Sequence, residues 1–179
     1  MLVDDLRYPI GTFDLKKEVP ENQICSLIDQ IEALPQLLIR AVERLTDEQL
    51  DTSYRPGGWT IRQLVHHLAD SNMNAYIRFK LAMTEDEPTI KPYDEALWAE
   101  LDDSRLPVEI STTLLEGLHK RWVILLRSLS SSGLDRKLIH PDIGQLAIKK
   151  LIDLYAWHGS HHLAQITSGI SRMTHDETK

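Results

Sequence analysis

Four long segments of the chain repeat apolar residues at intervals of three or four, and this pattern restricts the possible folds more than any other feature of the sequence. The segments span residues 20–45, about 60–83, about 112–129 and about 148–172. Such spacing places apolar side chains on one face of an α-helix, and that face must be buried against another element. Because little of the remaining chain resembles strands, the pattern predicts an all-α fold, a four-helix bundle.

The connections between the predicted helices differ in length. Residues 84–110 contain three prolines and many acidic residues, and we expect one short helix there, around 95–101. A connection of this length is uncommon in a compact domain and is often functional, and it would let the bundle depart from simple up-down topology. Residues 137–148 hold short apolar runs on either side of a turn, which predicts a small β-hairpin before the last helix. Thr60, followed by Gln63, predicts a capping box at the start of the second helix.

A length of 179 residues suits a single domain, and we expect residues 1–179 to form one. Residues 1–19 include Pro9 and Gly11 and show no sustained period, so we expect an extended arm on the surface. Residues 173–179 are polar and are expected to fray from the end of the last helix.

Composition and charge exclude several classes of function. The chain has 20 Lys and Arg against 27 Asp and Glu, a net charge of -7, whereas a nucleic-acid binder needs a local excess of basic residues. No stretch approaches the ~18–20 apolar residues that span a bilayer, and the N-terminus lacks the pattern of a signal peptide. We therefore expect a cytoplasmic protein with no nucleic-acid or membrane partner. The single cysteine, Cys25, excludes an internal disulfide and a CxxC zinc site, and we expect it to be a small buried hydrophobe.

Histidine is the unusual residue, because five of the eight histidines lie in two tight clusters. His158 and His162 are four residues apart on the last predicted helix, so two imidazoles on one face could bind one metal ion. His158 and His161, three residues apart, could converge in the same way. A zinc site needs at least three protein ligands, and the third could be His66 or His67 on a facing helix. These two flank the apolar face of their helix on opposite sides, so helical phase does not choose between them.

The residues around the histidines limit the chemistry. In HExxH proteases the Glu after the first His is the general base, and here Gly159 stands at that position, which excludes a thermolysin-type site. Acid–base partners would have to come from Asp70, one turn beyond His67, or from Tyr93, Asp94 and Glu95 in the long connection. For each of these side chains, solvation or helix capping is the more common role.

Four further residues carry weaker signals. Asn72 lies near the centre of the apolar face of its helix, so it needs hydrogen-bond partners and serves either the site or the fold. His119 and His140 are isolated, and we expect them to be exposed. Among the tryptophans, only Trp157 is required by the sequence to lie near the proposed metal, because it adjoins His158.

The chain resembles the DinB/YfiT-like superfamily, and is most similar to the YfiT type of metal-dependent hydrolases. The resemblance is carried by GGWTIRQLVHHLADSNMNAYIRFKLAMTEDEPTIKPYDEALWAEL at 57–101 and by YAWHGSHHLAQIT at 155–167. It extends over nearly the whole chain through YPIG at 8–11, QLDTSYR at 49–55, LHKRW at 118–122 and HPD at 140–142.

The resemblance implies a four-helix bundle that binds one divalent metal per chain, zinc in the first place and nickel in the second, through three histidines. The first ligand of the family is the His immediately before Leu-Ala in the second helix, which is His67 here. The other two ligands match His158 and His162, which leaves His66 and His161 as non-ligands. The resemblance also implies a homodimer.

Three functions are compatible with this reading. In a metal-dependent hydrolase, the fourth coordination position binds water, which then attacks a small-molecule substrate. Some DinB-like relatives are instead thiol S-transferases, in which that position binds a low-molecular-weight thiol such as bacillithiol as its thiolate. The lack of an obvious general base slightly favours the transferase. The third possibility is a non-enzymatic bundle stabilised by its metal.

Overall fold

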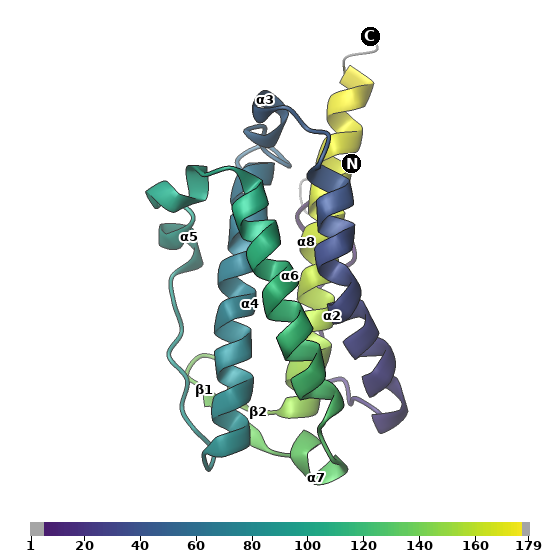
Figure 1. Cartoon of the computed structure of the whole chain (residues 1–179), viewed down its shortest axis with the longest axis vertical. Helices are drawn as coiled ribbons and strands as arrows, with labels where there is room; N and C mark the ends of the chain where they lie inside the picture. The colour runs from purple at the N-terminus through teal and green to yellow at the C-terminus, as the bar shows by residue number, and fades with distance from the viewer. Residues whose placement is uncertain (1–5, 177–179) are drawn as a thin grey trace.

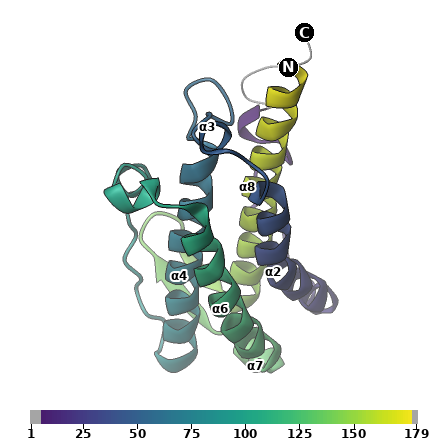
Figure 2. The same ribbon diagram turned by 45° about the horizontal axis from the view of Figure 1, so that its top comes forward.

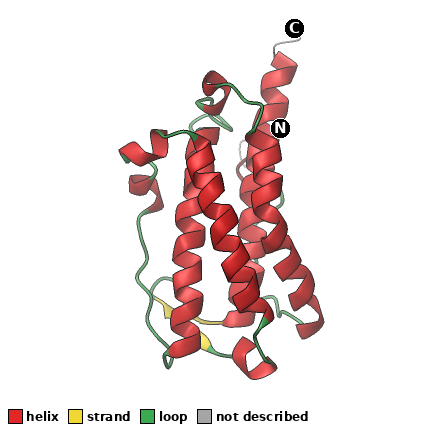
Figure 3. Ribbon diagram, viewed as in Figure 1, coloured by secondary structure: helices red, strands yellow, loops and turns green. Residues whose placement is uncertain are grey.

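The structure, a computed structural model, describes residues 6–176 of the chain. Four long helices dominate this part of the chain, and they confirm the predicted all-α bundle (Figures 1 and 3). They are α2 (Glu21–Val42), α4 (Ile61–Thr84), α6 (Val108–Arg127) and α8 (Ile148–Asp176). None of the helices described is long and apolar enough to cross a membrane.

Short elements occupy the connections. The predicted hairpin is present: β1 and β2 pair antiparallel, with Lys137 opposite Ala147 and His140 opposite Gly144. Gly144 has a φ of 81°, a conformation that favours glycine, so it suits the end of this turn. The short elements are α3 (Asp47–Leu50), α5 (Glu95–Trp98), the 3-10 helix η1 (Asp102–Arg105), α7 (Ser131–Leu134), β1 (Lys137–His140) and β2 (Gly144–Ala147).

The long connection between α4 and α6 produces an unusual order of helix directions. Helices α2 and α8 run in one direction, and α4 and α6 run in the other (Figure 1). Helix α2 packs against α8 and α6, and α4 packs against α6 and α8, so α2 and α4 lie diagonally opposite (Figure 2). Residues 85–107 bring the chain back along the bundle so that α6 starts beside the start of α4. The predicted departure from up-down topology is therefore present.

The start of α4 is held by the capping box that the sequence predicts. The Thr60 side chain accepts a hydrogen bond from the Gln63 backbone N–H at 3.1 Å, and Gln63 Oε1 accepts one from the Thr60 N–H at 3.0 Å. The cap therefore sets where α4 begins, and with it the position of His67 about two turns later.

Three predicted helix boundaries were wrong. Helix α2 ends at Val42 rather than Leu45, because the chain turns at residues 43 and 44 and the Leu45 N–H bonds the Val42 carbonyl oxygen. Helix α6 begins at Val108 rather than near residue 112. Pro107 fits directly before the first turn because the N–H that proline lacks is not needed there, and Val108 is already buried in the core. The last helix continues to Asp176, so residues 173–176 are helical and not frayed; 177–179 lie outside the described residues. Met173 packs against the core, and Arg172 donates a hydrogen bond to the Tyr54 carbonyl, which explains the extra turn.

The N-terminal arm lies against α8. After a short helical stretch at Leu6 and Arg7, residues 8–19 have no regular secondary structure, and 1–5 lie outside the described residues. The Lys150 ammonium group donates hydrogen bonds to the carbonyls of Asp14 and Lys17 at 2.8 and 3.0 Å, and Phe13 packs 5.6 Å from Trp157 between ring centroids.

The apolar core is divided into two clusters. One, at the end of the bundle with the β-hairpin, includes Phe79, Trp122 and Ile152; the other, toward α3, includes Leu38, Leu68 and Ile166. On α8, the last residue of the first cluster is Ala156, and the second cluster includes Leu163 and Ile166. His158 and His162 therefore lie between the two clusters along this helix. The core thus surrounds a polar layer near the middle of the bundle.

Candidate metal centre

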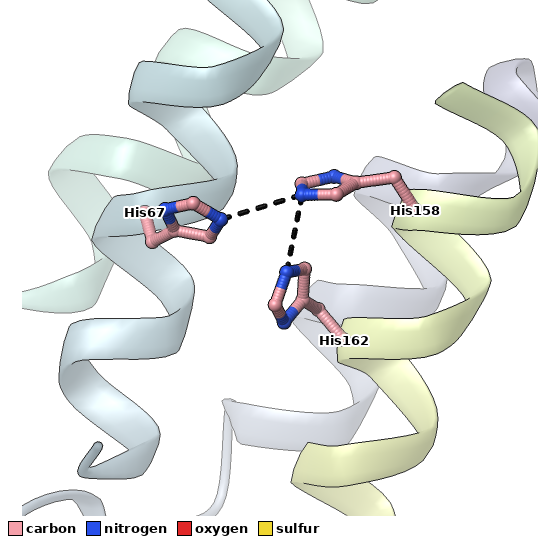
Figure 4. A group of neighbouring side chains, drawn as sticks. All are labelled: His67, His158 and His162. Carbon is pink, nitrogen blue, oxygen red and sulfur yellow. Dashed lines mark hydrogen bonds between the residues drawn. The ribbon is translucent and has the colours of Figure 1, made fainter. Parts of the chain in front are cut away.

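Three histidines from two helices face one point inside the bundle. His67 lies on α4, and His158 and His162 lie one turn apart on α8 (Figure 4). The Nε2 atom of His158 is 3.3 Å from Nε2 of His67 and 3.1 Å from Nε2 of His162. One ring nitrogen from each residue lies within 4.8 Å of those of the other two. The structure thus brings together the three residues that the family resemblance selects.

Burial keeps these three rings neutral. Desolvation lowers the pKa of His67 to about 3, with His162 as a second cause. The pKa values of His158 and His162 are also lowered well below the ordinary value, first by burial and then by neighbouring histidines. Neutral imidazole is the form that offers a lone pair to a metal ion, so all three rings are in the state that a metal requires.

The hydrogen bonding of the three rings also fits a cation. The Nε2 atoms of His67 and His162 both approach the same Nε2 of His158, and the single hydrogen of a neutral ring cannot satisfy both contacts. The other nitrogen of His158, Nδ1, is buried and has no hydrogen-bond partner among the described residues. Three convergent nitrogen ligands with room for a further one are the donor set of a catalytic zinc site.

A buried glutamine fixes the orientation of His162. Gln165 Oε1 lies 2.8 Å from His162 Nδ1, and because an amide oxygen only accepts, the ring hydrogen is on Nδ1 and the lone pair is on Nε2. The Gln165 amide nitrogen donates to the Arg7 carbonyl at 2.7 Å and lies 2.9 Å from His161 Nε2. Sequence reasoning missed Gln165, although its position one turn beyond His162 was visible.

The remaining clustered histidines point elsewhere. His66 Nδ1 lies 2.7 Å from Ser111 Oγ, and its Nε2 lies 2.9 Å from the Leu106 carbonyl oxygen, so both nitrogens are used at the contact with α6. The His161 ring stacks on Trp157, with centroids 4.7 Å apart and planes 17° apart. Of the residues that helical phase left as alternatives, the structure places His67 with His158 and His162, and it places His66 and His161 outside this group.

Gly159 faces away from the histidines. A Cβ atom at this position would lie 2.7 Å from Leu34 Cδ2 on α2. The helix face that carries a general base in HExxH proteases is therefore occupied here by helix–helix contact, and a base has to come from another element.

Four weaker expectations have mixed outcomes. His140 is partly buried, not exposed, because its side chain lies in the wall of a cavity and only 18% of it is exposed. Asn72 is buried and donates to the Leu68 carbonyl at 2.6 Å, so its visible role is within α4. His119 is buried, not exposed, because it lies on the core face of α6 and its Nδ1 bonds the Ile31 carbonyl oxygen at 2.7 Å. Cys25 is exposed, not buried, because it lies beside the apolar face of α2 rather than on it.

A second tryptophan contacts the site. The Trp59 ring lies 4.9 Å from the His67 ring between centroids, although the sequence linked only Trp157 to the histidines. Trp59 comes from the loop before α4, which the chain's fold brings over the cluster.

Two cavities meet at His158. The larger, about 390 Å³, is bordered by the arm and the loop before α4, with Arg7, Arg55 and His162 in its wall. The smaller, about 170 Å³, lies on the side of the β-hairpin and has Arg78 in its wall. A third hollow of about 630 Å³ lies elsewhere, around Arg62. Arg62 is held there by Asp47 and Asp51 at 2.7 and 2.6 Å, so we interpret that region as structural.

The structure separates the predicted acid–base candidates. Glu95 lines both cavities next to His158. Although the residue is exposed, desolvation of its carboxylate raises its pKa, with Arg78 opposing and Asp94 adding to the rise. Asp94 accepts the Leu97 backbone N–H at 3.0 Å, so it caps α5 and has the ordinary role.

The other two candidates are placed differently. The Tyr93 hydroxyl is buried in the wall of the smaller cavity beside Ser71, and it makes no well-formed hydrogen bond with the described residues. Asp70 is half-buried, and its pKa is raised to about 6, mainly by desolvation and to a smaller extent by the charge of Asp103. It does not line either cavity.

Fold and site together define a helical bundle with a cluster of three histidines that could hold a metal ion, and comparison with known proteins assigns the chain to a family. The chain belongs to the DinB superfamily, whose family model matches residues 30–166. The family membership expected from the sequence is therefore confirmed.

Particular relatives make the assignment more specific. A "Putative metal-dependent hydrolase" of Bacillus cereus (strain AH820) is 57% identical over 166 residues, which cover 93% of this chain and 96% of the relative. A protein of the same name from Bacillus anthracis (strain A0248) matches equally. The structure of YfiT from Bacillus subtilis has a TM-score of 0.91 and 47% identity, and the match covers 95% of this chain and 98% of that chain. YfiT is described as "a probable metal-dependent hydrolase with an unusual four-helix bundle topology".

Proposed function

We propose that this protein is a metal-dependent hydrolase of small molecules in which His67, His158 and His162 hold one divalent metal ion. The observation that carries the proposal is the convergence of three neutral imidazoles, within 4.8 Å of one another, at a point bordered by two cavities. The names of the curated relatives and of YfiT support the same reaction class.

The donor set favours zinc as the metal, with nickel second. Three imidazole nitrogens with an open position are typical of catalytic zinc, whereas magnesium and calcium prefer oxygen ligands. Imidazole also suits nickel.

Three residues near the histidines have proposed roles in the reaction. A divalent metal at this site supplies Lewis-acid activation of water and polarisation of the substrate bond. Gln165 keeps the hydrogen of His162 on Nδ1, so that Nε2 faces the site. Glu95, in the wall of both cavities, would accept the proton released during the attack, and desolvation raises the pKa of its carboxyl, which makes the carboxylate a stronger base. The Trp59 ring packs beside the His67 ring and would shield that side of the site.

A thiol S-transferase is the second candidate function. No carboxylate hydrogen-bonds any of the three rings within residues 6–176, and activation of a thiol needs no base once the thiolate has formed. In this case a low-molecular-weight thiol would be the second substrate and would occupy the larger cavity.

Metal content and thiol dependence test these proposals. We expect about one metal ion per chain in the purified protein, lost on His158→Ala or His162→Ala and retained in His161→Ala, whose ring lies outside the group. Hydrolysis of a panel of activated esters and amides should require the metal and proceed without added thiol. Conjugation of an electrophile only when thiol is present would replace the hydrolase by the transferase. Unchanged metal content in both ligand variants would refute the three-histidine site.

The homodimer and the cytoplasmic location implied earlier stay predictions. Exposed apolar side chains on α5, on α6 and on either side of η1 offer a surface for a second copy, among them Leu97, Leu101, Leu106 and Ile110. Sedimentation equilibrium of the purified chain would test the dimer.

A further inference from the structure

The smaller cavity beside His158 is lined by two chemically different groups of side chains, one apolar and one polar. Its volume is about 170 Å³, which is enough for a small organic molecule. The apolar group comes from the β-hairpin and the first turns of α8 and includes Leu138, Leu146, Leu151 and Leu154. The polar group includes Arg78 and Tyr155, which are hydrogen-bonded to each other. A ligand that fills this cavity therefore needs an aliphatic part and a polar group.

Arg78 is the strongest polar feature of the cavity. It lies on α4, 11 residues beyond His67, which is about three turns and therefore the same face of the helix. Its Nη1 donates to the Tyr155 hydroxyl at 3.0 Å, and its Nη2 makes a long contact of 3.5 Å with the Lys91 carbonyl oxygen. Arginine has five N–H donors, so most of the hydrogen-bonding capacity of this partly buried guanidinium is unused by these two contacts.

The charges that face Arg78 do not neutralise it by direct pairing. Glu95 lines the same cavity and is close enough for each charge to affect the other, but no ion pair within 4.0 Å joins Arg78 to any acid among residues 6–176. Desolvation lowers the pKa of His140, which is also in the wall, and this favours its neutral form. The cavity therefore keeps an unpaired cation.

Two tyrosine hydroxyls add donors at the same place. Tyr155 is buried and accepts from Arg78, so its own O–H remains free to donate to an acceptor in the cavity. The Tyr93 hydroxyl is buried without a well-formed partner in the described chain. A buried donor without a partner is costly, and an acceptor on a ligand would remove that cost.

We propose that the smaller cavity binds the carboxylate of a small aliphatic ligand, with the carboxylate on Arg78 and Tyr155 and the aliphatic part against the leucines. A planar guanidinium matches a carboxylate with two parallel hydrogen bonds. The cavity borders His158, so a ligand bound there would lie beside the histidine cluster. The assignment of this ligand as the substrate rests on the proposed function, whereas the binding of the ligand does not.

The test measures binding of 3-methylbutanoate, a branched aliphatic carboxylate, to the full chain after removal of metal with a chelator. Because the metal is absent, the carboxylate cannot bind by coordination. Dissociation constants come from NMR shift titrations, and the uncharged 3-methylbutanamide serves as the matched ligand. We expect the carboxylate to bind at least about tenfold more tightly than the amide, and Arg78→Gln to remove this difference. The control Arg121→Gln removes the same charge from the exposed face of α6 and should change nothing.

Further variants keep the test decisive if Arg78→Gln folds poorly. Tyr155→Phe should weaken carboxylate binding and leave amide binding unchanged, and Glu95→Gln should strengthen carboxylate binding by removing a nearby negative charge. Equal affinities for the two ligands, or an affinity that Arg78→Gln and Tyr155→Phe both leave unchanged, would overturn the proposal. So would binding that appears only after metal is restored, because the carboxylate would then be a metal ligand. If the carboxylate binds but the metal-loaded chain hydrolyses none of the activated esters and amides, the proposed function is refuted and the carboxylate site is not.

Discussion

Gln165 shows how a single side chain can determine the chemistry of the histidine cluster. Its amide oxygen holds the hydrogen of His162 on Nδ1, and its amide nitrogen ties the same side chain to the N-terminal arm through the Arg7 carbonyl. Metal-binding histidines commonly depend on such an outer partner, which fixes the orientation and the hydrogen position of the ring.

Replacing Gln165 should therefore weaken metal binding without removing a ligand. We expect Gln165→Leu to lower metal affinity roughly 10–100-fold, measured by competition with a chromogenic chelator. Gln165→Glu keeps an acceptor for Nδ1–H and should retain most of the affinity. Gln36→Leu, which removes an exposed glutamine from α2, is the control. Wild-type affinity in Gln165→Leu would contradict the assigned role.

His119 gives a prediction on pH at the same scale. Burial, opposed by the hydrogen bond to the Ile31 carbonyl, lowers the pKa of His119 to about 4, below the unfolded value near 6.5. A lowered pKa means that stability is complete above about pH 6.5 and is lost as the pH falls toward 4, because the unfolded chain binds the proton more readily.

In the metal-free protein, His119→Gln should flatten the decline in unfolding free energy between pH 6.5 and 4 by up to about 3 kcal/mol. Urea unfolding at several pH values measures this change. His140→Gln removes a histidine that is only partly buried and should change the profile much less. An unchanged slope in His119→Gln would show that His119 does not titrate as proposed.

Among the elements, α4 and α8 carry the site because their geometry is regular. The capping box at Thr60 sets where α4 begins, and the helical repeat then places His67, Ser71 and Arg78 on one face. On α8, Tyr155, His158 and His162 share a face for the same reason, while Gly159 lies on the face that meets α2.

Two glycine substitutions test this division of helix faces. In Gly159→Ala the new Cβ would lie 2.7 Å from Leu34 Cδ2, so we expect a loss of about 1 kcal/mol in unfolding free energy. In Gly117→Ala the new Cβ on α6 meets nothing within 4 Å, so higher helix propensity should stabilise the protein by about 0.5–1 kcal/mol. Chemical denaturation measures both. Stabilisation by Gly159→Ala would mean that α2 and α8 are less closely apposed than the structure shows.

For the whole molecule, the division of the core into two apolar clusters explains why folding need not depend on metal. Each cluster is built from all four long helices, including Ile28, Phe79, Trp122 and Ile152 in one and Leu38, Leu68, Leu115 and Ile166 in the other. A metal between the clusters would add stability to a bundle that is already packed.

Metal removal should therefore lower stability while leaving the fold intact. We expect the chelated protein to keep its helical circular dichroism at 25 °C. At a free metal concentration of 100 times the Kd, binding should raise the Tm by about 5–10 °C. Loss of helicity on chelation would show instead that the metal is structural. The Gln165→Leu protein should show a smaller rise, since its metal affinity is lower.

The sequence by itself determined the class of fold and the group of candidate ligands, because both depend on local repeats. Apolar residues at helical spacing required four amphipathic helices, the turn residues around Pro141 predicted the hairpin, and the four-residue spacing of His158 and His162 put them on one face. These features need no knowledge of distant contacts.

Only the tertiary structure decided which side chains meet across the bundle. His66 and His67 flank the same helix face, but their neighbours come from distant parts of the chain. His66 meets Ser111 and Leu106, whereas His67 meets the histidines of α8. Glu95 and Arg78 gained their place beside His158 in the same way, through the long connection and the diagonal arrangement of α2 and α4. Helical phase fixes a direction within one helix, whereas a site formed by two helices and a loop also requires their relative rotation, which only the packed core supplies.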